Sequence, residues 1–192
     1  YSVNLREFDY SAFGLTDYNT SSYGAAVTFG YPISEIQRLG INIAYDHTEL
    51  QQQGLSSREI LDFLESEGSE FDTFKLQGFW TRVTLNRGIF PTEGTLYQVS
   101  LQSTVPGSTL NYYRLDIKNE FYQPLFGDFI FKAASRVGYT GAYGDTKIPP
   151  YFENFYAGGP YSVKGYETNS LGPRITPVPC YEYDSENDYC PP

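Results

Sequence analysis

Apolar and polar residues alternate with a period of two along most of the chain. In one stretch, Tyr97, Val99 and Leu101 are interleaved with Gln98 and Ser100. Such alternation places apolar side chains on one face of a β-strand and polar side chains on the other. The pattern predicts seven strands, at about residues 1–10, 22–32, 39–50, 73–87, 95–105, 111–123 and 129–141.

The connections between these strands alternate in length. Those at 33–38, 88–94 and 124–128 are short, whereas those at 51–72 and after 142 are long. The strands are also longer than the five or six residues usual in soluble sheets, and a tilted strand needs about 9–11 residues to cross a membrane. Short turns at one end and longer loops at the other are typical of outer-membrane barrels. An antiparallel, all-β transmembrane barrel is therefore favoured over the alternative, a soluble β-sandwich.

One segment of the long connection 51–72 departs from the strand period. Ser56 and Glu59 have the spacing of a capping box, and Ile60, Phe63 and Leu64 fall on one helical stripe. We expect a short helix here, on the surface of a loop, with packing beneath that loop as its simplest role.

The last fifty or so residues, 142–192, contain no convincing strand. Their aromatic residues argue against disorder, and Gly158, Gly159 and Gly165 indicate tight turns. An ordered loop of this length is usually functional. Beside a barrel, it is expected to fold into the lumen or to cap it.

Composition and charge narrow the possible partners. The 192 residues include 19 Tyr and 14 Phe, which suit pleated sheets. A net charge of -10 argues against binding to nucleic acid, which requires clustered basic residues. No apolar run reaches 18 residues, so no transmembrane helix is expected. Because no signal peptide or initiating Met opens the chain, we interpret Tyr1 as the start of a fragment.

Two cysteines, Cys180 and Cys190, lie in a final segment rich in Pro, Tyr and Asp. In an oxidising compartment this pair is expected to close a small loop through a disulfide, and two free thiols are the alternative.

Residues with the chemistry of an active site are sparse. The sole histidine, His47, lies on a predicted strand and no Ser or Cys stands in a recognisable nucleophile motif, so a catalytic triad is not expected. The sequence has no paired His or Cys spacing of a metal site, and its Asp and Glu residues are scattered. We therefore expect neither an enzyme nor a bound cofactor or metal.

Several motifs follow one another in a fixed order along the chain. They are Tyr151-Phe152-Glu153-Asn154-Phe155-Tyr156-Ala157-Gly158-Gly159, Ser162-Val163-Lys164-Gly165-Tyr166 and Leu171-Gly172-Pro173-Arg174, preceded by Asp17-Tyr18-Asn19, Ser22-Tyr23-Gly24, Val27-Thr28-Phe29-Gly30-Tyr31-Pro32-Ile33, Asn86-Arg87-Gly88 and Phe90-Pro91-Thr92-Glu93-Gly94. This series resembles the BamA family of the Omp85 superfamily over nearly the whole chain. In that family the Glu-Asn-Phe segment leads into a Val-Arg-Gly-Phe/Tyr motif on the sixth extracellular loop.

The resemblance implies a sixteen-stranded barrel in the bacterial outer membrane, preceded by periplasmic POTRA domains. Residues 1–141 then correspond to about the fifth to eleventh strands, an incomplete portion of the barrel, and residues 142–192 to part of the lumen-folded sixth loop. The implied partners are outer-membrane lipids, unfolded outer-membrane protein clients and accessory lipoproteins that bind the POTRA domains outside this chain. The implied function is folding and insertion of β-barrel proteins, at a seam between the first and last strands, which also lies outside this chain.

The resemblance also assigns roles within the loop. Val163, Lys164, Gly165 and Tyr166 are expected to anchor it in the lumen, Glu153, Asn154, Gly158 and Gly159 to shape it, and Cys180 and Cys190 to form its disulfide. Lys164 departs from the family pattern, which usually has Arg. Lysine keeps the charge but loses the planar, bidentate fork, so its contact with acidic groups on later strands becomes a point-charge interaction.

Related functions within and beyond the superfamily remain as alternatives. A two-partner secretion transporter or a TamA-type assembly factor shares the loop motif, although the upstream motifs favour the BamA family. A plain porin is less expected, because it would not carry the Val163 to Tyr166 motif.

Overall fold

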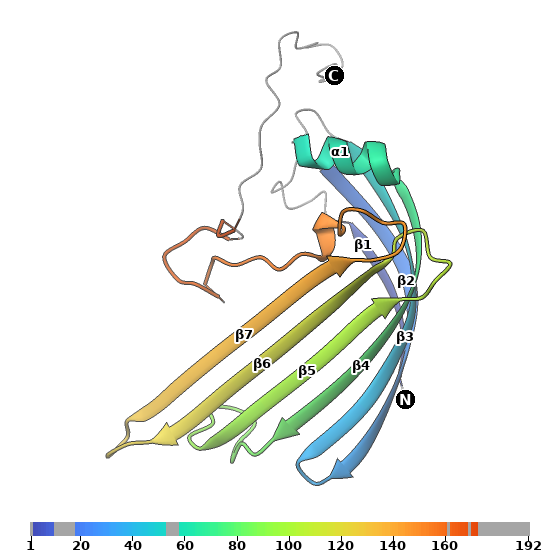
Figure 1. Ribbon diagram of the computed structural model, residues 1–192. Coiled ribbons are helices and arrows are strands. Elements are labelled where there is room, and N and C mark those ends of the chain that lie inside the picture. The colour runs from blue at the N-terminus through green and yellow to red at the C-terminus, as the bar shows by residue number, and fades with distance from the viewer. Residues whose placement is uncertain (1, 10–17, 53–57, 161, 169, 173–192) are drawn as a thin grey trace.

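The computed structural model describes residues 2–9, 18–52, 58–160, 162–168 and 170–172. In this part of the chain, seven strands pair in sequence order into one antiparallel sheet. The strands are β1 (Ser2–Asp9), β2 (Tyr18–Ser34), β3 (Gln37–Gln52), β4 (Glu70–Val83), β5 (Gly94–Thr104), β6 (Tyr112–Pro124) and β7 (Ile130–Ala142). The predicted all-β, antiparallel fold is confirmed, and the sheet formed by these described residues is curved and not closed (Figure 1).

Strand register follows the alternation seen in the sequence. Ile43 on β3 is paired with Leu76 on β4, and both side chains are about half exposed. Their polar neighbours point to the opposite face, where Asn42 Nδ2 donates to Gln77 Oε1 at 3.5 Å. We call the polar face the inner face and the apolar face the outer face. A sheet whose exposed face is apolar is built for a non-aqueous surrounding.

Turns and loops divide between the two ends of the sheet. The β2–β3, β4–β5 and β6–β7 turns lie at one end, whereas α1 (Arg58–Glu67) and the segment after β7 lie at the other (Figure 1). The β2–β3 connection is tighter than predicted, because only Glu35 and Ile36 separate the strands. No helix among the described residues is long and apolar enough to cross a membrane.

The predicted helix is present and runs further than the stripe suggested. It continues to Glu67, where Gly68 adopts φ +93° and donates its N–H to the Leu64 carbonyl at 3.0 Å. This is the usual way for a glycine to end a helix. The predicted cap residue Ser56 lies outside the described residues.

A small hydrophobic cluster lies under α1, on the inner side of the sheet. Phe63 from the helix packs with Phe71 on β4, at 5.7 Å between ring centroids. The other buried members are Leu50, Leu110 and Tyr112, and the partly buried Leu64, Tyr151 and Phe152 pack against them. Tyr151 and Phe152 belong to the short 3-10 turn η2 (Tyr151–Glu153), so the cluster joins the helix to the segment after β7.

Candidate functional site

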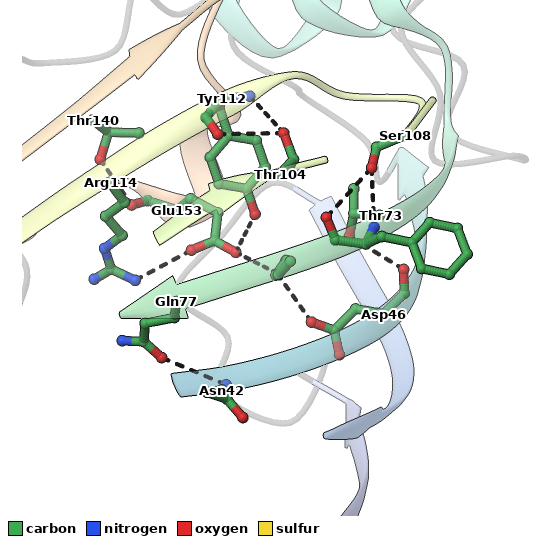
Figure 2. Close-up of polar contacts among 12 residues, drawn as sticks. Asn42, Asp46, Thr73, Gln77, Thr104, Ser108, Tyr112, Arg114, Thr140 and Glu153 are labelled. Atoms are coloured by element: carbon green, nitrogen blue, oxygen red, sulfur yellow. Dashed lines mark hydrogen bonds and ion pairs between the residues drawn. The ribbon is translucent and has the colours of Figure 1, made fainter. Parts of the chain in front are cut away.

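The segment after β7 is fixed to the inner face by the carboxylate of Glu153. Lys75 Nζ on β4 donates to Glu153 Oε1 at 2.7 Å, and Arg114 Nη1 on β6 donates to Oε2 at 3.2 Å. The hydroxyl of Tyr112 donates to Oε1 at 2.9 Å. Figure 2 shows Glu153 between Tyr112 and Arg114, with its carboxylate directed at the strands. Both carboxylate oxygens are therefore held by donors from the sheet.

Lys75 also connects this contact to a neighbouring strand. Its Nζ lies 3.1 Å from Asp46 Oδ2 on β3. The side chains of Lys75 and Glu153 keep only 15% and 13% of their exposure. Buried charges are tolerated when they are paired and hydrogen-bonded. We call Asp46, Lys75, Arg114 and Glu153 the wall–loop cluster, because three of them lie on the strands and the fourth on the loop.

The cluster keeps Glu153 ionised. Burial on its own raises the pKa of the carboxyl group. The Lys75 charge and the hydrogen bonds from Lys75 and Tyr112 outweigh burial, with a further contribution from the Arg114 charge, so the pKa of Glu153 is lowered from its ordinary value. The loop therefore presents a stable anion to the wall at neutral pH.

An aromatic contact next to the cluster adds a second attachment. The Phe155 ring has the guanidinium carbons of Arg114 and Arg136 at 4.3 and 5.6 Å from its centroid. Both distances are within the range of cation–π attraction. The ring also lies over Gly138 of β7, where an added Cβ would be 2.5 Å from ring atoms. Gly138 therefore gives Phe155 the space to reach the strand surface.

The double glycine predicted to shape the loop adopts backbone conformations that favour glycine. Gly158 and Gly159 have φ values of +113° and +94°. The Gly158 N–H donates to Ser162 Oγ at 2.7 Å, and the Gly159 N–H donates to the Tyr166 carbonyl at 3.0 Å. A bridge between Ala157 and Leu171 closes the same small loop. Asn154 has an exposed side chain, and its backbone N–H donates to the Tyr151 carbonyl at 3.2 Å.

The motif Val163, Lys164, Gly165 and Tyr166 lies inside this glycine-closed loop and is exposed. Within the described part of the chain, no ion pair involves Lys164. The family resemblance implies acidic partners for it on later barrel strands, which are not among the described residues, so its role as a lumen anchor stays a prediction. Cys180 and Cys190 lie outside the described residues.

His47 is part of a polar group on the outer face. Its Nδ1 lies 2.9 Å from Asp72 Oδ1, and its Nε2 lies 3.3 Å from Glu49 Oε1. The Tyr45 hydroxyl donates to the same Asp72 oxygen at 2.7 Å. Both ring nitrogens of His47 are thus engaged with carboxylates. No group of three or more potential metal ligands is found among the described residues.

Sequence reasoning missed the strand residues that receive the loop. Lys75, Arg114 and Gly138 stand at polar positions of the alternation, and this signal places them on the inner face. Their partners Glu153 and Phe155 lie on a later segment of the chain, and Glu153 follows Lys75 by 78 positions. The spacing of residues could not reveal that pairing.

The curved antiparallel sheet, with its apolar outer face and a loop bound to its polar inner face, defines part of the wall of a membrane β-barrel. Residues 1–189 match the Omp85 superfamily domain. The chain therefore belongs to the Omp85 superfamily, as the motifs indicated.

Individual proteins agree with this membership. The outer membrane protein assembly factor BamA of Neisseria meningitidis serogroup B is 30% identical over 185 residues, which cover 91% of this chain and 23% of that protein. The sorting and assembly machinery component 50 homolog of Mus musculus is 30% identical over 105 residues, covering 54% of this chain and 20% of that protein. The chain thus spans about a fifth of the length of these curated relatives.

A solved structure shows the same architecture. The crystal structure of BamA from Haemophilus ducreyi lacking POTRA domains 1–3 superimposes with a TM-score of 0.80 and 26% sequence identity. The match covers 98% of this chain and 37% of that chain. The barrel fold expected from the sequence is thereby confirmed.

Proposed function

We propose that this chain is part of the barrel wall, with the attached lumen loop, of a factor that folds and inserts β-barrel proteins into the bacterial outer membrane. The observation that carries the proposal is the wall–loop cluster. It fixes a long loop on the inner face of a sheet whose outer face suits lipid. Relatives named as outer membrane protein assembly factors support the same function.

The role of this part is mechanical and does not include chemistry. Lys75, Arg114 and Tyr112 come from two strands that are separated by β5 in the sheet, and one carboxylate binds them all. Attaching the loop across β4, β5 and β6 limits how far these strands can shear or separate. A rigid wall on this side leaves opening and client entry to other strands of the barrel.

The partners in this proposal are outer-membrane lipids, unfolded outer-membrane protein clients, and accessory lipoproteins bound through POTRA domains beyond these residues. Lipids face the apolar side chains of the outer face, such as Ile43, Leu76 and Val137. We also propose that the factor is not an enzyme and uses no cofactor.

Reconstitution of the complete protein tests this function. The complete protein is placed in phospholipid vesicles, an unfolded outer-membrane barrel protein is added, and the folded, protease-protected client is measured over time. Vesicles without the factor give the background rate. We expect accelerated folding into the membrane. Delivery of the client into the vesicle interior without insertion would instead indicate a secretion transporter.

A further inference from the structure

Apolar side chains gather at the three turns opposite α1. These turns connect β2 to β3, β4 to β5 and β6 to β7, at the same end of the sheet (Figure 1). In Phe90, Ile89 and Phe126, 87%, 77% and 71% of the surface is exposed. We call the exposed apolar residues in and beside the turns the turn rim: Ile33, Ile36, Ile89, Phe90, Leu125, Phe126 and Phe129. Water-exposed turns are normally built from Gly, Pro, Asn, Asp and Ser, so this composition calls for an apolar surrounding.

The β4–β5 turn is held in a fixed shape that presents its tip. Asn86 Oδ1 accepts the N–H groups of Thr92 and Glu93 at 3.1 and 3.3 Å, and Asn86 Nδ2 donates to Thr92 Oγ1 at 2.6 Å. These bonds close the base of the turn and leave Ile89 and Phe90 outside it. The exposure of these two side chains therefore follows from the hydrogen-bonded conformation of the turn.

The backbone at Phe90 is also unfavourable for its residue type. Phe90 has φ +51°, a left-handed conformation that costs free energy for any residue with a Cβ. Among the described residues it is the one non-glycine with positive φ. The turn thus combines a strained backbone with an exposed aromatic ring. Burial of the ring in an apolar surrounding would offset the free-energy cost of the backbone conformation and that of exposing the ring to water.

The turn rim is continuous with the outer face of the sheet. Phe121 on β6 and Phe131 on β7 lie on the outer face, with ring centroids 6.4 Å apart. In the turn that joins these two strands, Phe126 and Phe129 form the next aromatic pair, at 5.1 Å. In this hairpin the apolar surface of the strands therefore continues into the turn, with Gln123 as an exposed polar side chain on the outer face between the two aromatic pairs.

We propose that the turn rim inserts into the headgroup region of the membrane leaflet on its side, so that phospholipid covers it. This inference rests on the proposed placement of the outer face in a membrane. Aromatic residues favour this interfacial depth, where an apolar ring and a polar surrounding are both available. Insertion anchors these turns in the membrane, and with them the adjoining ends of the strands that carry the wall–loop cluster.

Two features favour lipid over a folded protein as the occupant. The rim follows the curve of the sheet across three separate hairpins, and a lipid layer adapts to a curved line of contacts (Figure 1). The turns also carry charges of both signs beside the apolar tips, including Arg87, Glu35 and Asp128. Zwitterionic headgroups supply partners for both signs.

Site-directed spin labelling of the complete protein tests the proposal. Single cysteines replace Phe90 or Phe126, in a background in which Cys180 and Cys190 are serine, and the labelled protein is reconstituted in phosphatidylcholine vesicles. Ile43→Cys on the outer face is the lipid reference, and Asp145→Cys in the exposed loop at the opposite end is the water reference. Power-saturation electron paramagnetic resonance then compares collisions with oxygen, which enters lipid, and with a nickel chelate, which stays in water.

At positions 90 and 126, as at position 43, we expect the label to collide more often with oxygen than with the nickel chelate. At position 145 we expect more frequent collisions with the chelate. Chelate access at 90 and 126 with a lipid signal at 43 overturns the inference and leaves the proposed barrel wall intact. Protection from both reagents at 90 and 126 also overturns it, and identifies a protein cover. A water signal at 43 overturns both proposals. The two labelled turns are independent, so a label that prevents folding at one leaves the other decisive.

Discussion

At the scale of residues, attachment of the loop depends on a few buried polar contacts. Glu153 is the only loop residue in the wall–loop cluster, whereas its partners lie on two strands. Removing one member of a buried ion pair lowers stability more than removing one member of an exposed pair does, because the remaining charge stays buried without compensation. The sheet itself has its own ladder of backbone hydrogen bonds and does not rely on this carboxylate.

The first prediction concerns Glu153→Gln. Neutralising the carboxylate leaves Arg114 without its acidic partner and Lys75 with Asp46 alone. We expect loop attachment to weaken by on the order of 3 kcal/mol, measured as faster hydrogen exchange at residues 151–159 in the complete protein. Glu167→Gln, an exposed residue of the same loop, is the matched control and should exchange like the unmodified protein. Equal exchange in both variants would contradict the prediction.

The second prediction follows from the lowered pKa of Glu153. A carboxyl group with a lowered folded-state pKa contributes stability above its unfolded pKa, here 4.5, and loses it as pH falls through the folded value. Loop attachment should therefore be constant near neutral pH and weaken below about pH 4.5. Hydrogen exchange at residues 151–159, corrected for its intrinsic pH dependence, measures this change. Glu153→Gln should lack this component of the pH dependence, and its persistence would assign the effect to another group.

At the scale of elements, the strands were the most predictable part of the fold. The bounds of all seven were predicted to within a few residues, because a sheet with one apolar and one polar face imposes alternation on every strand. Helix α1 was expected from its stripe, and the signal for its end, Gly68, was present in the sequence. The partners of η2 could not be predicted, because periodicity describes the face of an element and not what crosses over it.

The third prediction concerns the contact between β7 and the loop. Gly138→Ala adds a Cβ that would lie 2.5 Å from the Phe155 ring, so the ring must leave the strand surface. We expect a cost of about 1–3 kcal/mol in loop attachment, with β7 still paired to β6. Gly30→Ala on β2, where nothing lies within 4 Å of an added Cβ, is the control. Proteolytic sensitivity of the segment after β7 distinguishes the variants, and equal sensitivity would contradict this packing.

The fourth prediction concerns α1. The Phe63 side chain of α1 is fully buried against the rings of Phe71 and Tyr151, so Phe63→Ala leaves a cavity in the small hydrophobic cluster. We expect a loss of about 3–5 kcal/mol in the stability of the helix against local opening. Hydrogen exchange across residues 58–67 provides the measurement. The exposed Glu65→Ala on the same helix should change little, and a similar effect in both would contradict the burial argument.

At the scale of the whole molecule, the sequence predicted the wall, and its motifs indicated the family, but neither supplied the contact that joins loop to wall. The strand pairing follows from neighbouring elements, which sequence order already brings together. Loop attachment depends on residues that meet only when the sheet has curved. The role of Lys164 has the same character, since the partners that the family resemblance implies for it are not among the described residues.

The fifth prediction addresses Lys164 in the complete protein. Lys164→Ala should weaken packing of the loop in the lumen and reduce assembly activity, because the implied acidic groups lose their cation. The measurements are the heat-modifiable migration of the barrel and growth of a depletion strain complemented with the variant. Lys147→Ala, another exposed loop lysine, is the control. Unchanged migration and growth in the Lys164 variant would count against the anchor.

The separation of Lys75 and Glu153 has a consequence for the order of folding. Their contact spans 78 positions, and the contact between Lys147 and Glu67 spans 80. Contacts of such high sequence separation carry a large loop-closure entropy and form late. Strands β4 to β7 must pair before Glu153 can reach Lys75. Loop docking is therefore a late event that reports a completed wall, and its release is expected to be an early step of unfolding.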